Sequence, residues 1–290
     1  MIAYNPKAWF TFIFRFHKAD TLRKLFTTII GIAIYTGLIV FTEQEVLLLD
    51  KTNKLNNIGI VHSMLGFVIS MLLVFRTNTA YERWWDGRKM WGQLINCNRN
   101  LAIKVANVIE DPILNDIKKL IIAFPFALKN HLRNFQGKQE AEIAVLAAEI
   151  DLSKNQHIPL SISNLTYQKV LELNKKGIIN TAQILIINNE LQQWMEICGG
   201  CERIKNTPIP FSYSVFIKKF IFFYVMTLPF SMVISLSYYC IPVVVFIFYV
   251  LASMELIAEE IENPFGVDAN DLPIDEICKN ARKSIEQIIK

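Results

Sequence analysis

The sequence predicts an all-α membrane protein, with four transmembrane helices and a helical water-facing domain inserted between the second and the third. Hydrophobic residues make up 52% of the 290 residues and the mean hydropathy is +0.31, which is rich for a soluble protein and lean for one buried wholly in lipid. Four apolar runs are about long enough to cross a bilayer. The long stretch between the second and third runs repeats apolar residues with helical periodicity instead.

The chain begins with a basic and aromatic segment, Met1–Lys24, of a composition that suits the inner surface of a membrane. Leu25–Phe41 is the first predicted span, and Thr42–Asn57 is a polar loop without an excess of positive charge. Because lysine and arginine concentrate on the cytoplasmic side, this loop is expected outside and the N-terminus inside.

Ile58–Phe75 is the second predicted span, and apart from His62 it contains no ionisable side chain. Basic residues and tryptophans follow it at once, which marks its cytoplasmic end. These residues are Arg76, Arg83, Trp84, Trp85, Arg88, Lys89 and Trp91.

Three bulky residues of this span, Phe67, Met71 and Phe75, recur at every fourth position and therefore lie along one face of a helix. Gly66 and Ser70 form a small pair at the same spacing, which lets membrane helices approach closely. For membrane helices in general, such an apolar stripe faces lipid or packs against a neighbour. A pore-lining stripe is the alternative interpretation.

Residues 76–214 are predicted to form a helical cytosolic domain, because they contain no run long enough to cross a membrane. Three segments show helical periodicity: Ile113–Phe135, Lys138–Ile150 and Ile178–Cys198. Asp151–Ser163 is polar and contains Pro159, so it is predicted to be a loop.

The run Thr207–Pro210 has two prolines and is predicted to be extended. Phe220–Leu236, which Pro229 should kink, and Ile241–Ile257 are the third and fourth spans, joined by a tight turn near Ser237–Cys240. Four spans place both termini in the cytoplasm of a protein of the cell (inner) membrane. The predicted segments are a cytosolic lead-in (1–24), spans one and two (25–75), a cytosolic domain (76–214), spans three and four (215–257) and a cytosolic tail (258–290).

Several blocks of residues keep one family's order and spacing over most of the chain. They are Phe75–Asn78, Tyr81–Trp85, Gly87–Lys89, Trp91–Gly92, Gly199–Ile204, Asn206–Phe211 and Asn263–Gly266. In these blocks the sequence resembles the bestrophins, specifically the bacterial members.

The resemblance implies a homopentameric ion channel in the lipid bilayer, whose second helix lines a narrow hydrophobic neck. Alignment on the Arg-Trp-Trp block places the neck at Phe67, Met71 and Phe75, so with the resemblance the pore interpretation of this stripe is preferred. A second constriction is implied in the cytosolic domain, with Ile179 and Ala182 as candidates. The alternative is a non-conducting membrane scaffold or regulator with the same fold.

Five copies of this stripe would form a constriction that gates by wetting and dewetting. Phenyl rings carry a positive edge, so rings that point their edges at the axis favour an anion. We therefore expect small monovalent ions to pass, chloride first and sodium or potassium second. The resemblance covers both anion-selective animal members and bacterial members described as cation-selective.

In the acidic tail, the resemblance matches Asp268 and Asp271 to acidic positions of the calcium clasp of animal bestrophins, and Asn263 offers a further oxygen. The acidic run is interrupted here, and calcium needs six to eight oxygen ligands. A structural role, in helix capping or ion pairing, is therefore favoured over a calcium site. We expect no cofactor.

Arg76 and Arg83 are interpreted as positive-inside anchors paired with Glu82 or Asp86, in preference to an anion attractor at the inner mouth. Cys198 and Cys201 have redox spacing but lie in a helical context, and the five cysteines suggest no disulfide framework.

His62 is expected to be a packed or interfacial histidine rather than a proton relay. The sequence shows no phosphate loop, nucleophile elbow or HExxH, so we expect neither an enzyme nor, at a net charge of +4, a nucleic-acid partner. A transporter is disfavoured because no pair of broken helices is visible.

Overall fold

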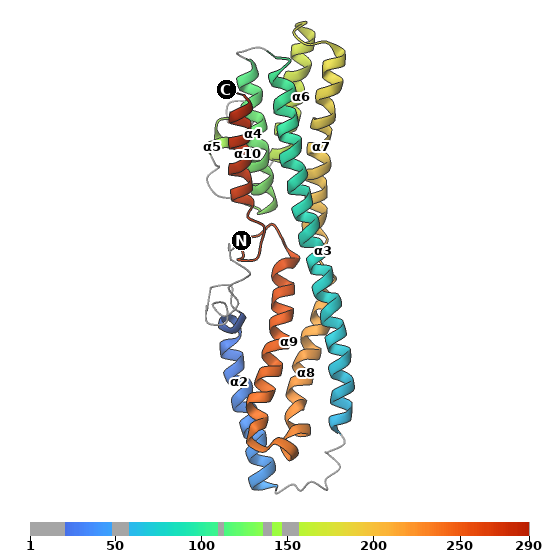
Figure 1. The fold of residues 1–290 in the computed structure, drawn as a ribbon, viewed down its shortest axis with the longest axis vertical. Helices are drawn as coiled ribbons and strands as arrows, with labels where there is room; N and C mark the ends of the chain where they lie inside the picture. The colour runs from blue at the N-terminus through green and yellow to red at the C-terminus, as the bar shows by residue number, and fades with distance from the viewer. Residues whose placement is uncertain (1–20, 48–57, 110–112, 136–140, 147–156, 290) are drawn as a thin grey trace. The chain divides into compact units, whose positions relative to one another are not determined.

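The computed structural model describes residues 21–47, 58–109, 113–135, 141–146 and 157–289. The described residues are helical and divide into two compact units (Figure 1). The first unit comprises the chain up to Arg83, Pro208–Glu262 and Asp268–Asn270, and the second comprises Trp84–Thr207, Asn263–Val267 and the chain from Asp271. The predicted lead-in falls mostly outside the described residues.

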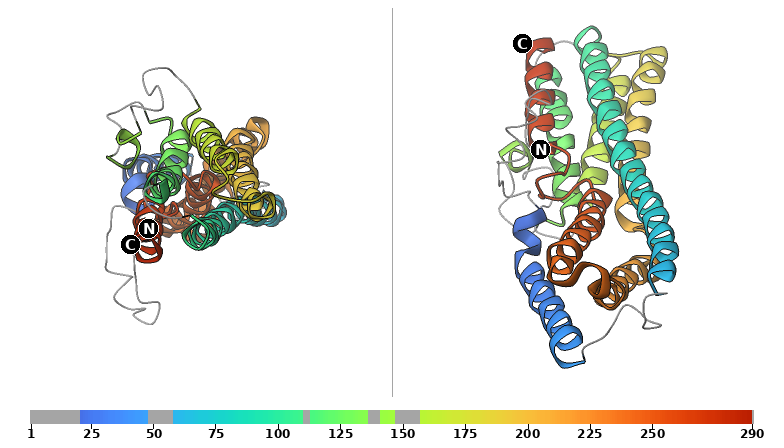
Figure 2. Two further views of the ribbon diagram at one scale, coloured as in Figure 1. Left: turned by 90° about the horizontal axis from the view of Figure 1, so that it is seen from above. Right: turned by 60° about the horizontal axis from the view of Figure 1, so that its bottom comes forward.

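The first unit is built from apolar helices. They are α2 (Thr21–Phe41), the short π-helical turn η1 (Thr42–Val46), the first part of α3 (Ile58–Ala106), α8 (Phe211–Leu236), the turn η3 (Ser237–Tyr239) and α9 (Cys240–Glu262). Helix α9 packs against both α2 and α8, which run beside it in Figures 1 and 2. The core of this unit, to which α3 also contributes, contains Val40, Leu73, Val225 and Val244.

Three stretches of the described residues are long and apolar enough to cross a membrane. They are Thr21–Val46, Gly59–Ala106 and Phe211–Glu262. The third stretch holds both α8 and α9, which the turn at Ser237 separates. Ser237 has a φ of 50°, so the chain reverses there in a conformation that few non-glycine residues adopt.

The second unit is built around α4 (Ile113–Leu132). This helix packs against α5 (Ala141–Ala144), α6 (Ile158–Lys175), α7 (Thr181–Asn206) and α10 (Ile274–Ile288). Phe124 of α4 stacks on Trp194 of α7 with ring centroids 4.3 Å apart. The indole Nε1 of Trp194 donates a hydrogen bond of 2.6 Å to Asn98 of α3, so a buried polar link accompanies the aromatic one.

One sequence-based prediction differs clearly from the structure. The predicted loop Asp151–Ser163 overlaps helix α6, because Pro159 occupies the first turn, where a missing N–H costs no helical hydrogen bond. Helix α3 continues beyond Phe75, the predicted end of the second span, as one helix to Ala106. Of the predicted helix Lys138–Ile150, the described part contains only the single turn α5.

Other predicted elements are observed with small changes of boundary. Helix α7 begins at Thr181 because the side chain of Asn180 accepts from Gln183 N–H while the side chain of Gln183 accepts from Asn180 N–H. Pro210 caps α8 in an extended conformation, as the prolines of Thr207–Pro210 predict.

Candidate ion pore and its anchoring network

Helix α3 presents two opposite faces within the first unit. Its buried stripe consists of His62, Ile69, Leu73, Arg76 and Ala80, at the three- and four-residue steps of one helix face. The predicted neck residues Phe67, Met71 and Phe75 are 72%, 50% and 53% exposed. At 3.6 residues per turn they lie roughly opposite the buried stripe, so the unit's own core does not use them.

Gly66 and Ser70, the small pair predicted on this helix, have different surroundings. A Cβ atom on Gly66 would lie 2.8 Å from the hydroxyl of Tyr224, so a side chain there would collide with α8. Ser70 is exposed, and its hydroxyl donates to the Gly66 carbonyl of its own helix at 2.8 Å. Gly66 therefore makes room for the Tyr224 side chain of α8.

His62 is packed, as predicted. Its Nε2 lies 3.0 Å from the hydroxyl oxygen of Thr227, and its ring lies tilted against Tyr224 with centroids 5.7 Å apart. Both partners belong to α8, so this histidine helps to hold α3 against its neighbour.

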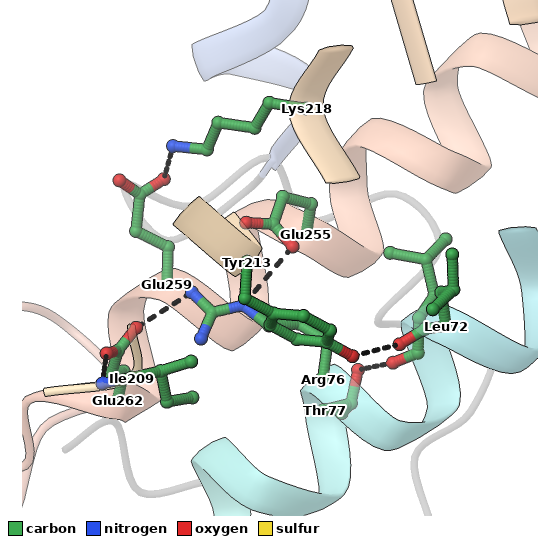
Figure 3. A network of polar contacts seen from close by, with 10 residues as sticks. Leu72, Arg76, Thr77, Ile209, Tyr213, Lys218, Glu255, Glu259 and Glu262 are labelled. Atoms are coloured by element: carbon green, nitrogen blue, oxygen red, sulfur yellow. Dashed lines mark hydrogen bonds and ion pairs between the residues drawn. The ribbon is translucent and has the colours of Figure 1, made fainter. Parts of the chain in front are cut away.

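Arg76 follows Phe75, the last of the predicted neck residues, and its side chain is only 1% exposed. Its Nη2 lies 2.7 Å from Glu262 Oε2 and its Nε lies 3.4 Å from Glu255 Oε2 (Figure 3). The other oxygen of Glu262 accepts from the backbone N–H of Ile209 at 2.7 Å. One guanidinium therefore connects α3 with α9, and through Glu262 with the segment that precedes α8.

Further polar contacts surround this guanidinium. The hydroxyl of Tyr213 donates to the carbonyl of Leu72 at 3.3 Å, and Lys218 pairs with Glu259 at 2.9 Å (Figure 3). Arg83 donates through Nε to the backbone carbonyl of Glu262 at 3.1 Å. Burial lowers the pKa of Arg83 below its ordinary value, although the charge of Glu262 acts in the opposite direction.

The predicted partners of Arg76 were wrong, although its predicted structural role fits the structure. Glu82 and Asp86 are exposed, and Asp86 pairs with Lys89 instead. Six and ten residues further along a helix, these acids lie on other faces and more than one turn away. Because the Arg76 side chain is buried, it is not available as an anion attractor.

The two candidates for the predicted cytosolic constriction, Ile179 and Ala182, differ in exposure, and the constriction itself stays a prediction. Ile179 is 2% exposed and packs in the core of the second unit, just before the cap of α7. It therefore cannot offer its side chain to a pore in this conformation. Ala182, in the first turn of α7, is exposed, as is Leu185 at 67%.

In the acidic tail, two side chains lie close to the backbone of Gly266. A Cβ on Gly266 would lie 2.6 Å from Asp271 Oδ2 and 3.7 Å from Asn263 Nδ2, so both side chains approach this glycine within the second unit. Asp268 belongs to the first unit. The structural role expected for Asn263, Asp268 and Asp271, in preference to a calcium site, stays a prediction.

Cys198 and Cys201 lie one turn apart on α7 and both are buried free thiols. Burial, with a smaller effect of the Glu202 charge, raises the pKa of Cys198 to about 12. Burial raises the pKa of Cys201 as well. Neither thiol is ionised at neutral pH, and a thiolate is the form that reacts or binds metal, which argues against redox or metal chemistry here.

Glu202, which follows Cys201, is a candidate site residue that the sequence did not reveal. Glu202 meets His131 and His157, two histidines that are 26 residues apart in the chain. Burial is the largest influence on both pKa values: it lowers that of His131 and raises that of Glu202. For Glu202, hydrogen bonds from His157 and His131 outweigh burial and bring the pKa below its ordinary value.

The model of the family described as bacterial/fungal bestrophin protein matches residues 1–287. The chain belongs to this family. The resemblance noted in the sequence is therefore confirmed, and the described structure agrees with the helical membrane fold that it implied.

Relatives and solved structures agree with this assignment. A voltage-dependent anion channel-forming protein of Synechocystis sp. is 38% identical over 234 residues, which cover 78% of this chain and 76% of that protein. One from Nostoc sp. is 36% identical over 230 residues, 77% and 75% of the two chains. A crystal structure of a mutated bacterial bestrophin homologue from Klebsiella pneumoniae is 25% identical, with a TM-score of 0.80 over 91% of this chain and 98% of that one.

Proposed function

We propose that this bestrophin is an anion channel of the cell (inner) membrane, with chloride as its first ion. Five copies surround a central pore, and each crosses the membrane four times, through α2, the first part of α3, α8 and α9. Both termini lie in the cytoplasm. The relatives named as anion channel-forming proteins support the choice of an anion.

The observation that carries the proposal is the exposed stripe of Phe67, Met71 and Phe75, opposite the face of α3 that its own unit buries. A ring of such side chains forms a hydrophobic constriction, which conducts when it is wetted and closes when it dries. Phenyl edges directed at the axis carry partial positive charge and favour an anion over a cation. Sodium or potassium is the second choice of ion.

Arg76 has a positioning role in this proposal. Because it directly follows Phe75 and is held by Glu255 and Glu262, it fixes the rotation of α3 at the inner end of the neck. Its charge is neutralised locally and does not face the ion path.

The experiment that tests this function is the reversal potential of the purified protein in a planar bilayer under a sodium chloride gradient. A potential near the chloride equilibrium value is expected. A value near that of sodium would retain the channel and reject the argument from ring edges. No current from an intact oligomer would instead support the non-conducting scaffold.

The neck is tested separately by truncating its side chains. Phe75→Ala or Met71→Ala should widen the constriction, favour wetting and raise single-channel conductance several-fold. The matched control is Phe223→Ala on α8, because Phe223 is 63% exposed but belongs to a different helix, and it should leave conductance unchanged. If the control raises conductance and the two neck variants do not, α3 is not the lining helix.

A further inference from the structure

Three side chains from three helices of the second unit converge on one point. His131 lies near the end of α4, His157 caps the start of α6, and Glu202 lies on α7. The Nε2 atoms of both histidines lie 2.6 Å from the same carboxylate oxygen, Glu202 Oε1. The side chains are 32%, 31% and 29% exposed, so solvent reaches the cluster.

We propose that His131, His157 and Glu202 form a binding site for a divalent transition metal of the zinc class. Two imidazoles and one carboxylate, completed by water, are an established ligand set for zinc. Imidazole nitrogen also suits the other late first-row metals. The ligand atoms all lie within 4.8 Å of one another, and each comes from a separate element that the core already holds in place.

The two distances to the carboxylate oxygen require only a small expansion to accept the ion. Tetrahedral zinc with bonds of about 2.0–2.1 Å separates its ligand atoms by about 3.3 Å. The two histidine nitrogens now lie 2.6 Å from the carboxylate oxygen, so each must retreat by less than about 1 Å. The histidine rings, with centroids 4.2 Å apart and planes 38° apart, already aim their Nε2 atoms at the common oxygen.

Two contacts of the metal-free cluster make metal binding less favourable. The Nδ1 atom of His157 accepts a hydrogen bond of 3.1 Å from the N–H of Leu160, so in the metal-free form the ring proton is on Nε2. A metal on Nε2 moves this proton to Nδ1 and displaces the helix cap. The second contact is electrostatic: the ammonium of Lys205 is near, although it is engaged by the His131 carbonyl at 3.2 Å and by Asn134 Oδ1 at 2.6 Å.

The consequence of binding is a cross-link within the second unit. The ion would tie the end of α4 and the first turn of α6 to α7, and a ligand that binds only the folded state stabilises it. This inference does not rest on ion conduction, because the cluster stabilises a fold whether or not the pore passes current.

The test is a calorimetric titration of zinc chloride into the purified, chelator-treated full-length oligomer. One zinc ion per subunit is expected. The decisive variant is His157→Ser, because serine is a good helix cap and removes only the metal ligand. It should weaken zinc binding by more than about 100-fold, since even the outer-shell partners of a ligand are worth up to that factor.

Two further variants separate ligation from folding. Glu202→Gln keeps a hydrogen-bond acceptor for both histidines and should also abolish binding. His62→Ala removes a histidine of the first unit and should leave the zinc affinity unchanged. Melting temperatures in chelator show that each variant is folded.

Absence of zinc binding by the wild-type protein would overturn the proposal, as would full affinity in folded His157→Ser. Zinc affinity lost in Cys198→Ser, with His157→Ser unaffected, would place the metal on the cysteine pair and equally reject this site.

Discussion

Each of the two units connects distant helices through a cluster of acids and bases, but the clusters differ in their exposure to water. In the first unit, Arg76, Glu255 and Glu262 have side chains that are 1%, 5% and 14% exposed. In the second unit, Asp275 is 55% exposed and pairs with Lys129 at 2.9 Å and with Arg133 at 2.8 Å. Water can therefore solvate the acid in the second cluster, whereas each charge of the first depends on its protein partners.

This difference changes what each cluster contributes. A buried charge that loses its partner carries a large desolvation penalty, whereas an exposed charge is rehydrated at little cost. The Arg76 cluster therefore fixes how α3 and α9 are held together in the first unit, next to the predicted neck residue Phe75. The exposed Asp275 cluster makes a smaller contribution to stability, by helping to hold α10 against α4.

The largest expected effect follows from removing the central charge of the buried cluster. Arg76→Gln leaves the carboxylates of Glu255 and Glu262 in a buried position without their guanidinium. We expect a loss of about 3–5 kcal/mol in the free energy of unfolding, measured by chemical unfolding in detergent. Retention of wild-type stability would show that the two acids are solvated or protonated in the assembled protein.

The control for this variant is Arg88→Gln on the same helix. Arg88 is exposed, so its replacement should change the free energy of unfolding by no more than about 0.5 kcal/mol. A large effect at Arg88 would mean that the assembled oligomer buries this surface, and the comparison of exposure would then have to be made on the oligomer.

The second prediction concerns variants that remove two charges of the buried cluster, first singly and then together. Arg76→Met and Glu255→Met should each destabilise, but the double variant should cost less than the sum of the two, because both desolvated charges disappear together. A coupling of about 0.5–3 kcal/mol is expected from the double-mutant cycle. Additive effects would assign Arg76 wholly to Glu262, which lies closer at 2.7 Å.

Much of the fold was predictable because it follows from local sequence patterns. Hydropathy identified the apolar helices, and four-residue spacing placed Phe67, Met71 and Phe75 on one face. The family blocks identified the bestrophin family. These signals arise from neighbours in sequence, which a single chain displays directly.

What could not be predicted depends on contacts between residues far apart in the chain. The partners of Arg76 are 179 and 186 residues away, and nearby acids such as Glu82 offered a misleading local alternative. The meeting of His131, His157 and Glu202 is of the same kind. The loop predicted around Pro159 was wrong for another reason. Proline breaks the middle of a helix but is well suited to its first turn.

The smallest expected effect concerns the exposed cluster, and it depends on pH. Burial raises the pKa of Asp275, but hydrogen bonds from Lys129 and Arg133 outweigh it and bring the pKa to about 2, below the ordinary 3.8. A folded-state pKa that is depressed contributes stability above the unfolded-state value, and this contribution is lost as the pH falls. Asp275→Asn keeps an oxygen acceptor for Lys129 but removes the charge and the oxygen that accepts from Arg133. Because the acid is exposed, at neutral pH we expect a loss of about 1 kcal/mol or less.

The matched control is Asp86→Asn, because Asp86 is equally exposed at 55% but pairs with the exposed Lys89 instead of a buried lysine. Thermal unfolding of both variants and the wild type, followed by circular dichroism between pH 7 and pH 2, checks the prediction. The difference between wild type and Asp275→Asn should stay constant down to about pH 4 and shrink toward pH 2. Asp86→Asn should differ little from wild type at neutral pH. If both variants lose the same stability at neutral pH, exposure of the acid alone sets the value of such a pair, and the burial of Lys129 adds nothing.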